Sequence, residues 1–156
     1  MGVEIERKFL LANDDWRRAA DSGLRLRQGY LSGDVRCSVR VRIAGDAAFL
    51  GVKSAASALR RLEFEYAIPM DDAEQLLQYV CLPTQVEKTR YRIPAGRHVW
   101  EIDVFEGANT GLVLAEIELE HEDAEFERPG WLGAEVSHDP RYFNMNLALN
   151  PFSQWD

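Results

Sequence analysis

Two pairs of glutamates with the spacing Glu-x-Glu stand near the two ends of the chain. They are Glu4 with Glu6, and Glu116 with Glu118. On a β-strand, side chains two residues apart point to the same side and lie about 7 Å apart. Carboxylate oxygens are the ligands that hard divalent cations prefer. If folding brings the two pairs together, we expect an oxygen cage for Mg²⁺ or Mn²⁺, although a lone Glu-x-Glu pair is common in acidic chains.

Basic residues recur elsewhere in the chain with a similar alternation. They are Lys8, Arg40, Arg42, Lys53, Lys88 and Arg90. An arginine offers a planar fork of donors to a phosphate, and a lysine offers a point charge. Magnesium is usually shared between one or two carboxylates and phosphate oxygens. The acidic and basic sets together therefore suit phosphoryl transfer, in which positioning and charge neutralisation provide most of the catalysis.

The elements that must position these residues are mainly strands, because polar and apolar residues alternate with period two through most of the sequence. The predicted strands span residues 3–9, 24–32, 35–43, 48–54, 61–68, 86–93, 99–105 and 112–120. Capping residues, glycines and prolines predict helices at 16–21, 73–80 and 139–149, with a short helical turn after Glu122. The fold class is therefore an α+β fold dominated by β-structure.

Charged faces of antiparallel strands ordinarily face water. Two features favour a closed barrel here: acidic and basic residues segregate onto different strands, and the apolar faces exceed what three short helices would cover. Eight strands can enclose one small ligand. We therefore expect an eight-stranded antiparallel β-barrel tunnel with a charged lumen and a few short helices packed outside. The uncovered apolar outer face also predicts a homodimer.

Composition sets limits on the function. The chain has 156 residues, which suits one domain over 1–156, and a net charge of −8. The negative charge argues against a protein that coats nucleic acid or an anionic membrane. Cys37 and Cys81 lack the spacing of zinc ligands, and no apolar run approaches the roughly 18 residues of a membrane-spanning helix. Because the N-terminal residues lack a signal-peptide pattern, we expect a cytoplasmic protein.

An ordered series of motifs runs through nearly the whole chain. The motifs are Glu4-Ile-Glu6-Arg-Lys8, Arg-Gln-Gly-Tyr30-Leu, Ser-Val-Arg40-Val-Arg42, Gly-Val-Lys53-Ser, Arg61-Leu-Glu63-Phe-Glu65, Val-Glu-Lys88-Thr-Arg90-Tyr, Glu101-Ile-Asp103-Val-Phe, Glu116-Ile-Glu118 and Asp-Pro-Arg141-Tyr-Phe-Asn. This series resembles the CYTH superfamily, the triphosphate tunnel metalloenzymes, whose signature is ExExK. It most resembles the short bacterial members similar to inorganic triphosphatases.

The resemblance implies a role for each matching position. The metal ligands would be Glu4, Glu6 and Glu118, with Glu116 near the same ion or on a second one. The phosphates would be held by Lys8, Arg40, Arg42, Lys88 and Arg90, and we add Arg61, on the strand of Glu63, to this substrate-binding set. Lys53 would lie near the attacked phosphorus with Tyr30 as its catalytic partner. Glu63 and Asp103 would orient the basic side chains through ion pairs inside the tunnel.

The activity implied by the resemblance is metal-dependent hydrolysis of inorganic tripolyphosphate to pyrophosphate and phosphate. Water would attack a terminal phosphorus, while the metal and the cations neutralise the charge that develops on the leaving oxygens. The sequence leaves open which group activates the water. A tunnel glutamate would serve, and so would Lys53 if neighbouring cations lowered its pKa.

Two alternatives stay open: hydrolysis or cyclisation of an organic triphosphate (nucleoside or thiamine triphosphate), and polyphosphate binding without turnover. Recognition of an organic ring needs an aromatic slot in the tunnel, but Phe64, Tyr66 and Trp100 have the outward parity. The double Glu-x-Glu argues against a pure anion binder. We therefore expect a small polyphosphate as the partner, with no nucleic acid and no membrane. The helix at 139–149 could close a tunnel mouth, form a lid or act as scaffold.

Overall fold

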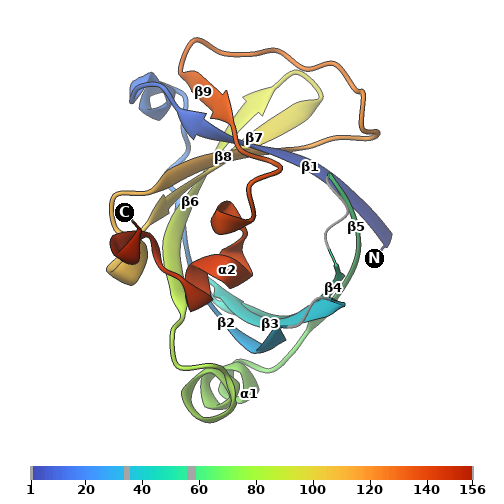
Figure 1. The fold of residues 1–156 in the computed structure, drawn as a ribbon, viewed down its shortest axis with the longest axis vertical. Coiled ribbons are helices and arrows are strands. Elements are labelled where there is room, and N and C mark those ends of the chain that lie inside the picture. The colour runs from blue at the N-terminus through green and yellow to red at the C-terminus, as the bar shows by residue number, and fades with distance from the viewer. Residues whose placement is uncertain (1, 34–35, 56–58, 156) are drawn as a thin grey trace.

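Antiparallel strands form a closed ring in the computed structural model, which describes residues 2–33, 36–55 and 59–155 (Figure 1). The strands of this part of the chain are β1 Gly2–Leu11, β2 Leu24–Gly33, β3 Cys37–Ala44, β4 Ala47–Ser54, β5 Arg60–Ala67, β6 Val86–Ala95, β7 His98–Phe105, β8 Val113–Glu118 and β9 Leu132–Glu135. Their order is β5-β4-β3-β2-β6-β7-β8-β1-β9, and a further pairing of β5 with β1 closes the ring. The predicted eight-stranded barrel is therefore confirmed.

The ninth strand shares one edge of β1 with β5. Residues 2–5 of β1 pair with β5, whereas Phe9 and Leu11 pair with β9. At four residues, β9 is too short for its alternation to be recognised in the sequence. The close approach of β9 depends on Gly133, because a Cβ there would lie 2.8 Å from the carbonyl oxygen of Leu10.

Each of the eight predicted strands occurs in the structure, with ends that differ by a few residues. The predicted start of one strand, at Val35, lies outside the described residues. The alternation works as expected in β1, where Glu4 and Lys8 face the lumen while Ile5 is buried in the outer core. Since the period of a strand is two, the same sequence supplies a charged inner face and an apolar outer face.

The helices are shorter than the sequence predicts. Of the three predicted helices, the first is a 3-10 helix, Asp15–Arg18, and the second is α1, Met70–Gln75, continued by a π-helical turn, Leu76–Val80. The third is broken by the extended backbone of Phe143 into a 3-10 helix, Pro140–Tyr142, and α2, Asn144–Leu149. In place of the short helical turn predicted after Glu122, Glu122 and Asp123 form a single turn closed by a hydrogen bond from the backbone N–H of Ala124 to the carbonyl of His121, and residues 124–129 are irregular. Two further 3-10 helices span Gly107–Asn109 and Phe152–Gln154.

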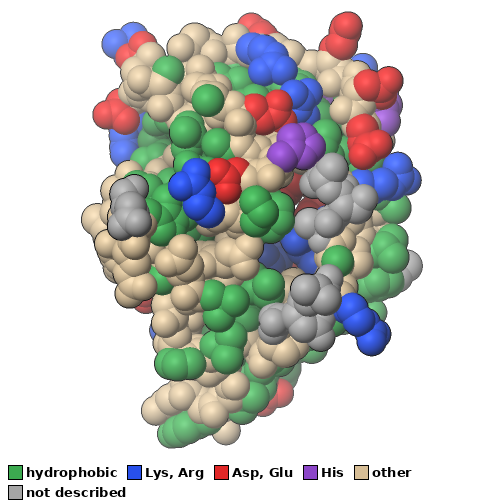
Figure 2. Space-filling model, in the orientation of Figure 1, with side chains coloured by type: hydrophobic (Ala, Val, Ile, Leu, Met, Phe, Trp, Pro, Cys, Tyr) green, Lys and Arg blue, Asp and Glu red, His purple; other side chains and the backbone are tan. Residues whose placement is uncertain are grey.

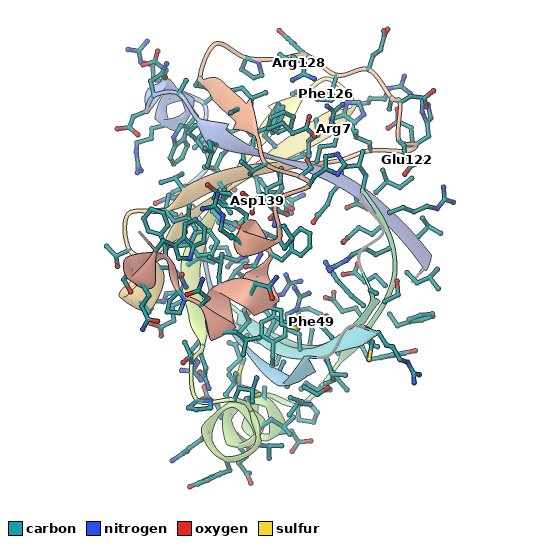
Figure 3. All side chains as sticks on the ribbon, viewed as in Figure 1. Arg7, Phe49, Glu122, Phe126, Arg128 and Asp139 are labelled. Carbon is teal, nitrogen blue, oxygen red and sulfur yellow. The ribbon has the colours of Figure 1, made fainter. Side chains whose placement is uncertain are left out.

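Two apolar clusters cover parts of the outer face of the ring. The larger one is centred on Trp100, whose ring meets Phe9, Phe126 and Trp131 edge-on. Figure 3 labels Phe126 between Arg7 and Arg128, outside the ring near β1. The smaller cluster places α1 and the π-helical turn over β2, β3 and β4. No helix in the described part of the chain is long and apolar enough to cross a membrane.

The third cluster lies at one end of the lumen. There Val86 and Leu114 continue the inward parity of Lys88 and Glu116, so the inner face changes from charged to apolar. The other members of the cluster are Tyr30, Phe105, Leu112, Tyr142, Leu147 and Ala148. The C-terminal segment therefore fills this end, and α2 lies within the outline of the ring in Figure 1. The sequence left open whether the 139–149 segment closes a tunnel mouth, forms a lid or acts as scaffold. In the structure it packs into one end of the lumen and closes that end.

Candidate active site

A charged cavity of about 650 Å³ occupies the lumen, and every strand of the ring contributes side chains to it. Figure 2 shows the hollow from the side of Figure 1, with charged side chains in its depth. The predicted site residues that line it are Glu4, Glu6, Lys8, Tyr30, Arg40, Arg42, Lys53, Arg61, Glu63, Lys88, Arg90, Glu116 and Glu118. Asp103 is the one predicted residue outside the lining, because it is fully buried behind Lys88 and Arg90.

The two glutamate pairs come together because β1 and β8 are neighbours. Glu6 is the direct cross-strand partner of Glu118, and Lys8 is the partner of Glu116. Burial raises the pKa of Glu6 to about 8, and the negative charges of Glu116 and Glu4 add to this effect. Burial and other carboxylates also raise the pKa of Glu118. The cations near Glu6 and Glu118 therefore do not offset the effects of burial and of the neighbouring carboxylates on these two groups.

A hard divalent cation fits the chemistry of this donor set, since it would supply the missing positive charge through oxygen ligands. Two of the carboxylates are already engaged: Glu4 lies 2.9 Å from the Nζ of Lys53, and Glu116 lies 3.5 Å from the Nζ of Lys8. Within the described residues, no three acidic, histidine or cysteine side chains stand together as a ready metal site. Binding of a cation would therefore require these side chains to rearrange.

Buried ion pairs hold the basic residues of β6. Asp103 accepts from Lys88 at 2.7 Å and from Arg90 at 2.8 and 2.9 Å. Burial would raise the pKa of Asp103, but Arg90 and Lys88 outweigh it and keep the pKa below its usual value. The same opposition keeps the pKa of Glu116 low, with Lys8 and Arg90 as the main cations. These groups therefore stay ionised in the interior.

Arg40 and Arg42, on β3, share one acidic partner. The Oε2 of Glu65 lies 3.1 Å from Arg42 and 3.5 Å from Arg40. The sequence analysis gave Glu65 no role, although its position two residues after Glu63 on the same strand face was a usable signal. Glu63 itself lies 3.5 Å from the Nζ of Lys53. Glu65 thus orients two arginines in the way expected of Glu63 and Asp103.

Lys53 and Tyr30, the predicted catalytic pair, both line the cavity but have other partners. Lys53 contacts Glu4 and Glu63, whereas the hydroxyl of Tyr30 accepts a hydrogen bond of 3.2 Å from Gln28. Burial lowers the pKa of Lys53, but Glu6 and Glu4 outweigh it and raise the pKa above its usual value. The carboxylates around Lys53 therefore favour its cationic form.

The C-terminal segment adds three contacts that the sequence analysis missed. The Nζ of Lys8 donates to the carbonyl of Tyr142 at 3.0 Å, and the Nζ of Lys88 donates to Asn144 at 2.8 Å. The ring of Phe143 lies 5.7 Å from the guanidinium of Arg61. Phe64, Tyr66 and Trp100 do not line the tunnel, as their parity predicts, but Phe143 does. Phe143 follows the 3-10 helix that begins at Pro140. The alternation of a strand is absent there, so the sequence did not predict which way this side chain points.

Comparisons with known proteins agree with this geometry. Residues 2–143 match the CYTH domain family. An inorganic triphosphatase of Acetivibrio thermocellus is 45% identical over 155 residues, which cover 99% of each chain. One from Nitrosomonas europaea is 40% identical over 153 residues, or 95% of this chain and 98% of the relative. The fold is similar to the crystal structure of an inorganic triphosphatase, with a TM-score of 0.67, 38% identity and 96% of each chain covered.

Proposed function

The chain belongs to the CYTH domain family, and we propose that it hydrolyses inorganic tripolyphosphate to pyrophosphate and phosphate. The observation that carries this proposal is the lumen, in which carboxylates and cations from seven of the eight strands of the ring face one cavity. An anion of several charges is the ligand that such a set of cations suits. The names and full-length similarity of the two relatives support the same substrate.

The proposed phosphate-binding residues come from four strands of the ring and lie at the wall of the cavity. They are Lys8, Arg40, Arg42, Arg61, Lys88 and Arg90. Asp103 holds the heads of Lys88 and Arg90 in fixed directions, and Glu65 does the same for Arg40 and Arg42. Glu63 lies beside the Nζ of Lys53. Because the ion pairs exist before substrate arrives, the basic side chains are already directed at the cavity, which favours catalysis.

Members of this family use a divalent metal, and we propose Mg²⁺ or Mn²⁺ as the ion. Its ligands would be Glu4, Glu6, Glu116 and Glu118. When bound, the ion would neutralise charge on the phosphate oxygens and on the leaving group. The raised pKa of Glu6, at about 8, supports this choice of ligands, because a cation bound beside Glu6 would stabilise its ionised form.

Lys53 is the proposed base for the attacking water, on one condition. Glu6 and Glu4 hold its pKa up, so it can accept a proton only when their negative charge is neutralised. Burial, which lowers the pKa of Lys53, then dominates. We propose that Tyr30 becomes the partner of Lys53 in that state, since its hydroxyl faces the same cavity. Lys53 would leave Glu4 to reach it.

The test is phosphate release from tripolyphosphate with Mg²⁺, with Mn²⁺ and with chelator. We expect release with either metal, none with chelator, and a loss of at least about 100-fold in Glu4→Ala and Lys53→Ala. Arg97→Ala, at an exposed arginine, is the control and should keep full activity. Full activity in either tunnel variant would remove the role of that residue. Faster hydrolysis of ATP or thiamine triphosphate would refute the inorganic substrate, and binding without release would indicate a sensor.

We also propose a cytoplasmic homodimer. The dimer is supported by apolar side chains on the outer faces of β1 and β5 that no helix of the described residues covers. Val3, Leu62 and Tyr66 are between 48% and 57% exposed there. Exposed apolar patches of this kind are typical of association surfaces. The cytoplasmic location is supported by the sequence, whose few cysteines suit a reducing compartment.

A further inference from the structure

Arg61 differs from the other cations of the tunnel in its partners. Each of the others has a carboxylate within 3.5 Å: Glu116 for Lys8, Glu65 for Arg40 and Arg42, Glu4 for Lys53, and Asp103 for Lys88 and Arg90. In residues 2–33, 36–55 and 59–155, no acidic group forms an ion pair with Arg61, and its buried Nε has no hydrogen-bond partner. Glu4 is its cross-strand partner on β1, but the close ion pair of Glu4 is with Lys53, so Arg61 has no carboxylate at ion-pair distance among these residues.

The aromatic ring of Phe143 takes the place of a carboxylate beside Arg61. The guanidinium of Arg61 lies 5.7 Å from the ring centre, and the Nζ of Lys8 lies 5.8 Å from it. An aromatic face attracts a cation without neutralising its charge. A carboxylate, in contrast, competes with an incoming phosphate for the same donors. The ring can thus hold Arg61 in place while its full charge stays available for an anion.

The backbone around Phe143 is anchored on both sides. The carbonyl of Tyr142 accepts from Lys8, and the side chain of Asn144 accepts from Lys88 and from Gln28. Tyr142 itself is 8% exposed and belongs to the apolar cluster that closes one end of the lumen. The ring of Phe143 therefore has a fixed position in the cavity, which a residue needs if it is to orient another.

We propose that Phe143 is a positioning residue that holds Arg61 ready for a phosphate of the substrate. Arg61 is then the cation whose loss weakens substrate binding most, because no tunnel carboxylate has to be displaced from it. This inference rests on the proposed function for the identity of the anion, tripolyphosphate. It concerns binding rather than the chemical step, so it predicts a change in KM and in affinity with little change in kcat.

The first experiment compares arginines by calorimetry with tripolyphosphate in the presence of chelator. Arg61→Gln is expected to lose about 30-fold or more in affinity, and Arg42→Gln less, because Arg42 already shares Glu65. Arg60→Gln is the matched control, since Arg60 precedes Arg61 on the same strand but is exposed on the outer face. An Arg61→Gln variant that binds as well as Arg42→Gln does would overturn the proposal.

The second experiment tests the aromatic ring itself. Phe143→Leu keeps an apolar side chain without the aromatic face, and we expect KM for tripolyphosphate to rise about 3- to 30-fold with kcat within about 3-fold. Phe143→Tyr should restore KM. The double variant with Arg61→Gln should bind at most about 3-fold worse than Arg61→Gln alone, because the ring acts mainly through that arginine and only its contact with Lys8 then remains. Additive losses, equal loss of kcat, or no rescue by tyrosine would contradict the proposal.

The two proposals fail in different ways. If the wild-type protein binds tripolyphosphate but releases no phosphate with Mg²⁺ or Mn²⁺, the proposed hydrolysis is wrong, and the calorimetric ranking of Arg61, Arg42 and Arg60 still tests the inference. If the wild-type protein turns over and the ranking is flat, only the inference is wrong. Should Phe143→Leu fail to fold, the Arg61 and Arg42 variants decide the matter.

Discussion

The ion pairs on two sides of the ring differ in how deeply they are buried. On the side formed by β6, β7 and β8, Asp103 and its partner Lys88 are at most 2% exposed, and the Trp100 cluster covers the outer face. On the side formed by β3, β4 and β5, Glu65 is 31% exposed, and Leu62 and Tyr66 on the outer face lie open. The first side is a scaffold whose central ion pair is fully buried. Both sides line the cavity, but the acidic partner of the arginines is partly exposed on the second side.

The largest effect that would test this comparison is the removal of the buried acid. Asp103→Ala leaves Lys88 and Arg90 without their shared partner in the interior, and we expect a loss of about 3–5 kcal/mol in the free energy of unfolding. Glu65→Ala removes a partly exposed partner of two arginines and should lose about 1 kcal/mol or less. Urea unfolding of both variants measures the difference. Equal losses would mean that the two sides are not distinct.

Lys88 offers a smaller test, through pH. Burial, together with the neighbouring Arg90, lowers the pKa of Lys88 to about 8 although Asp103 opposes the change. Above that pH the metal-free tunnel loses one positive charge, so tripolyphosphate should bind up to about 10-fold more weakly at pH 9 than at pH 7. Lys88→Met should bind more weakly at pH 7 and lack this part of the decline. Calorimetry in chelator compares the two profiles, and parallel profiles would argue against Lys88 as the titrating group.

Where β1 pairs with β8, Glu6 lies beside Glu118, and its carboxylate is not fully compensated by nearby cations. The pKa of Glu6 shows this. Its pKa of about 8 in the folded protein lies above the usual 4.5. Between these two values the folded state keeps a proton that the unfolded state releases, so the stability of the metal-free protein falls as pH rises from 4.5 to 8.

Glu6→Gln removes this decline while it also removes a proposed metal ligand. In chelator at pH 8 we expect the variant to have a Tm about 2–4 °C above that of the wild type, which corresponds to roughly 1 kcal/mol for a chain of this size. At pH 4.5 the two proteins should melt together. Thermal unfolding followed by circular dichroism makes the measurement. A variant that is less stable at both pH values would show that Glu6 is well compensated without metal.

Strand alternation explains why so much of the site could be predicted from the sequence. In a ring of strands, inward parity assigns Glu4, Arg40 or Lys88 to the lumen without any knowledge of the tertiary contacts. Closure then brings all of them to one cavity. The partner of each residue is harder to predict, because it depends on register and on the length of the side chains. Lys53 therefore pairs with Glu4 and not with the expected Tyr30.

The contribution of the C-terminal segment could not be predicted in the same way. Phe143 and Asn144 lie where a 3-10 helix ends and α2 begins, and neither a period of two nor one of 3.6 runs through that junction. Their entry into the lumen follows from the apolar cluster around Leu114, which needs cover at that end of the ring. The position of such a segment is set by long-range packing and not by local pattern.

The smallest expected effect concerns the outer face of β5. Leu62 and Tyr66 are 48% and 57% exposed, so Leu62→Ser with Tyr66→Ser removes little buried apolar area and should change the free energy of unfolding by about 0.5 kcal/mol or less in the monomer. If this face joins two copies, sedimentation at micromolar concentration should show a wild-type dimer and a monomeric double variant. A monomeric wild type would remove the proposed dimer and leave the open side as a surface without a partner. A large loss of stability in the monomeric variant would instead place these residues in a core, and the two sides of the ring would then be equally well packed.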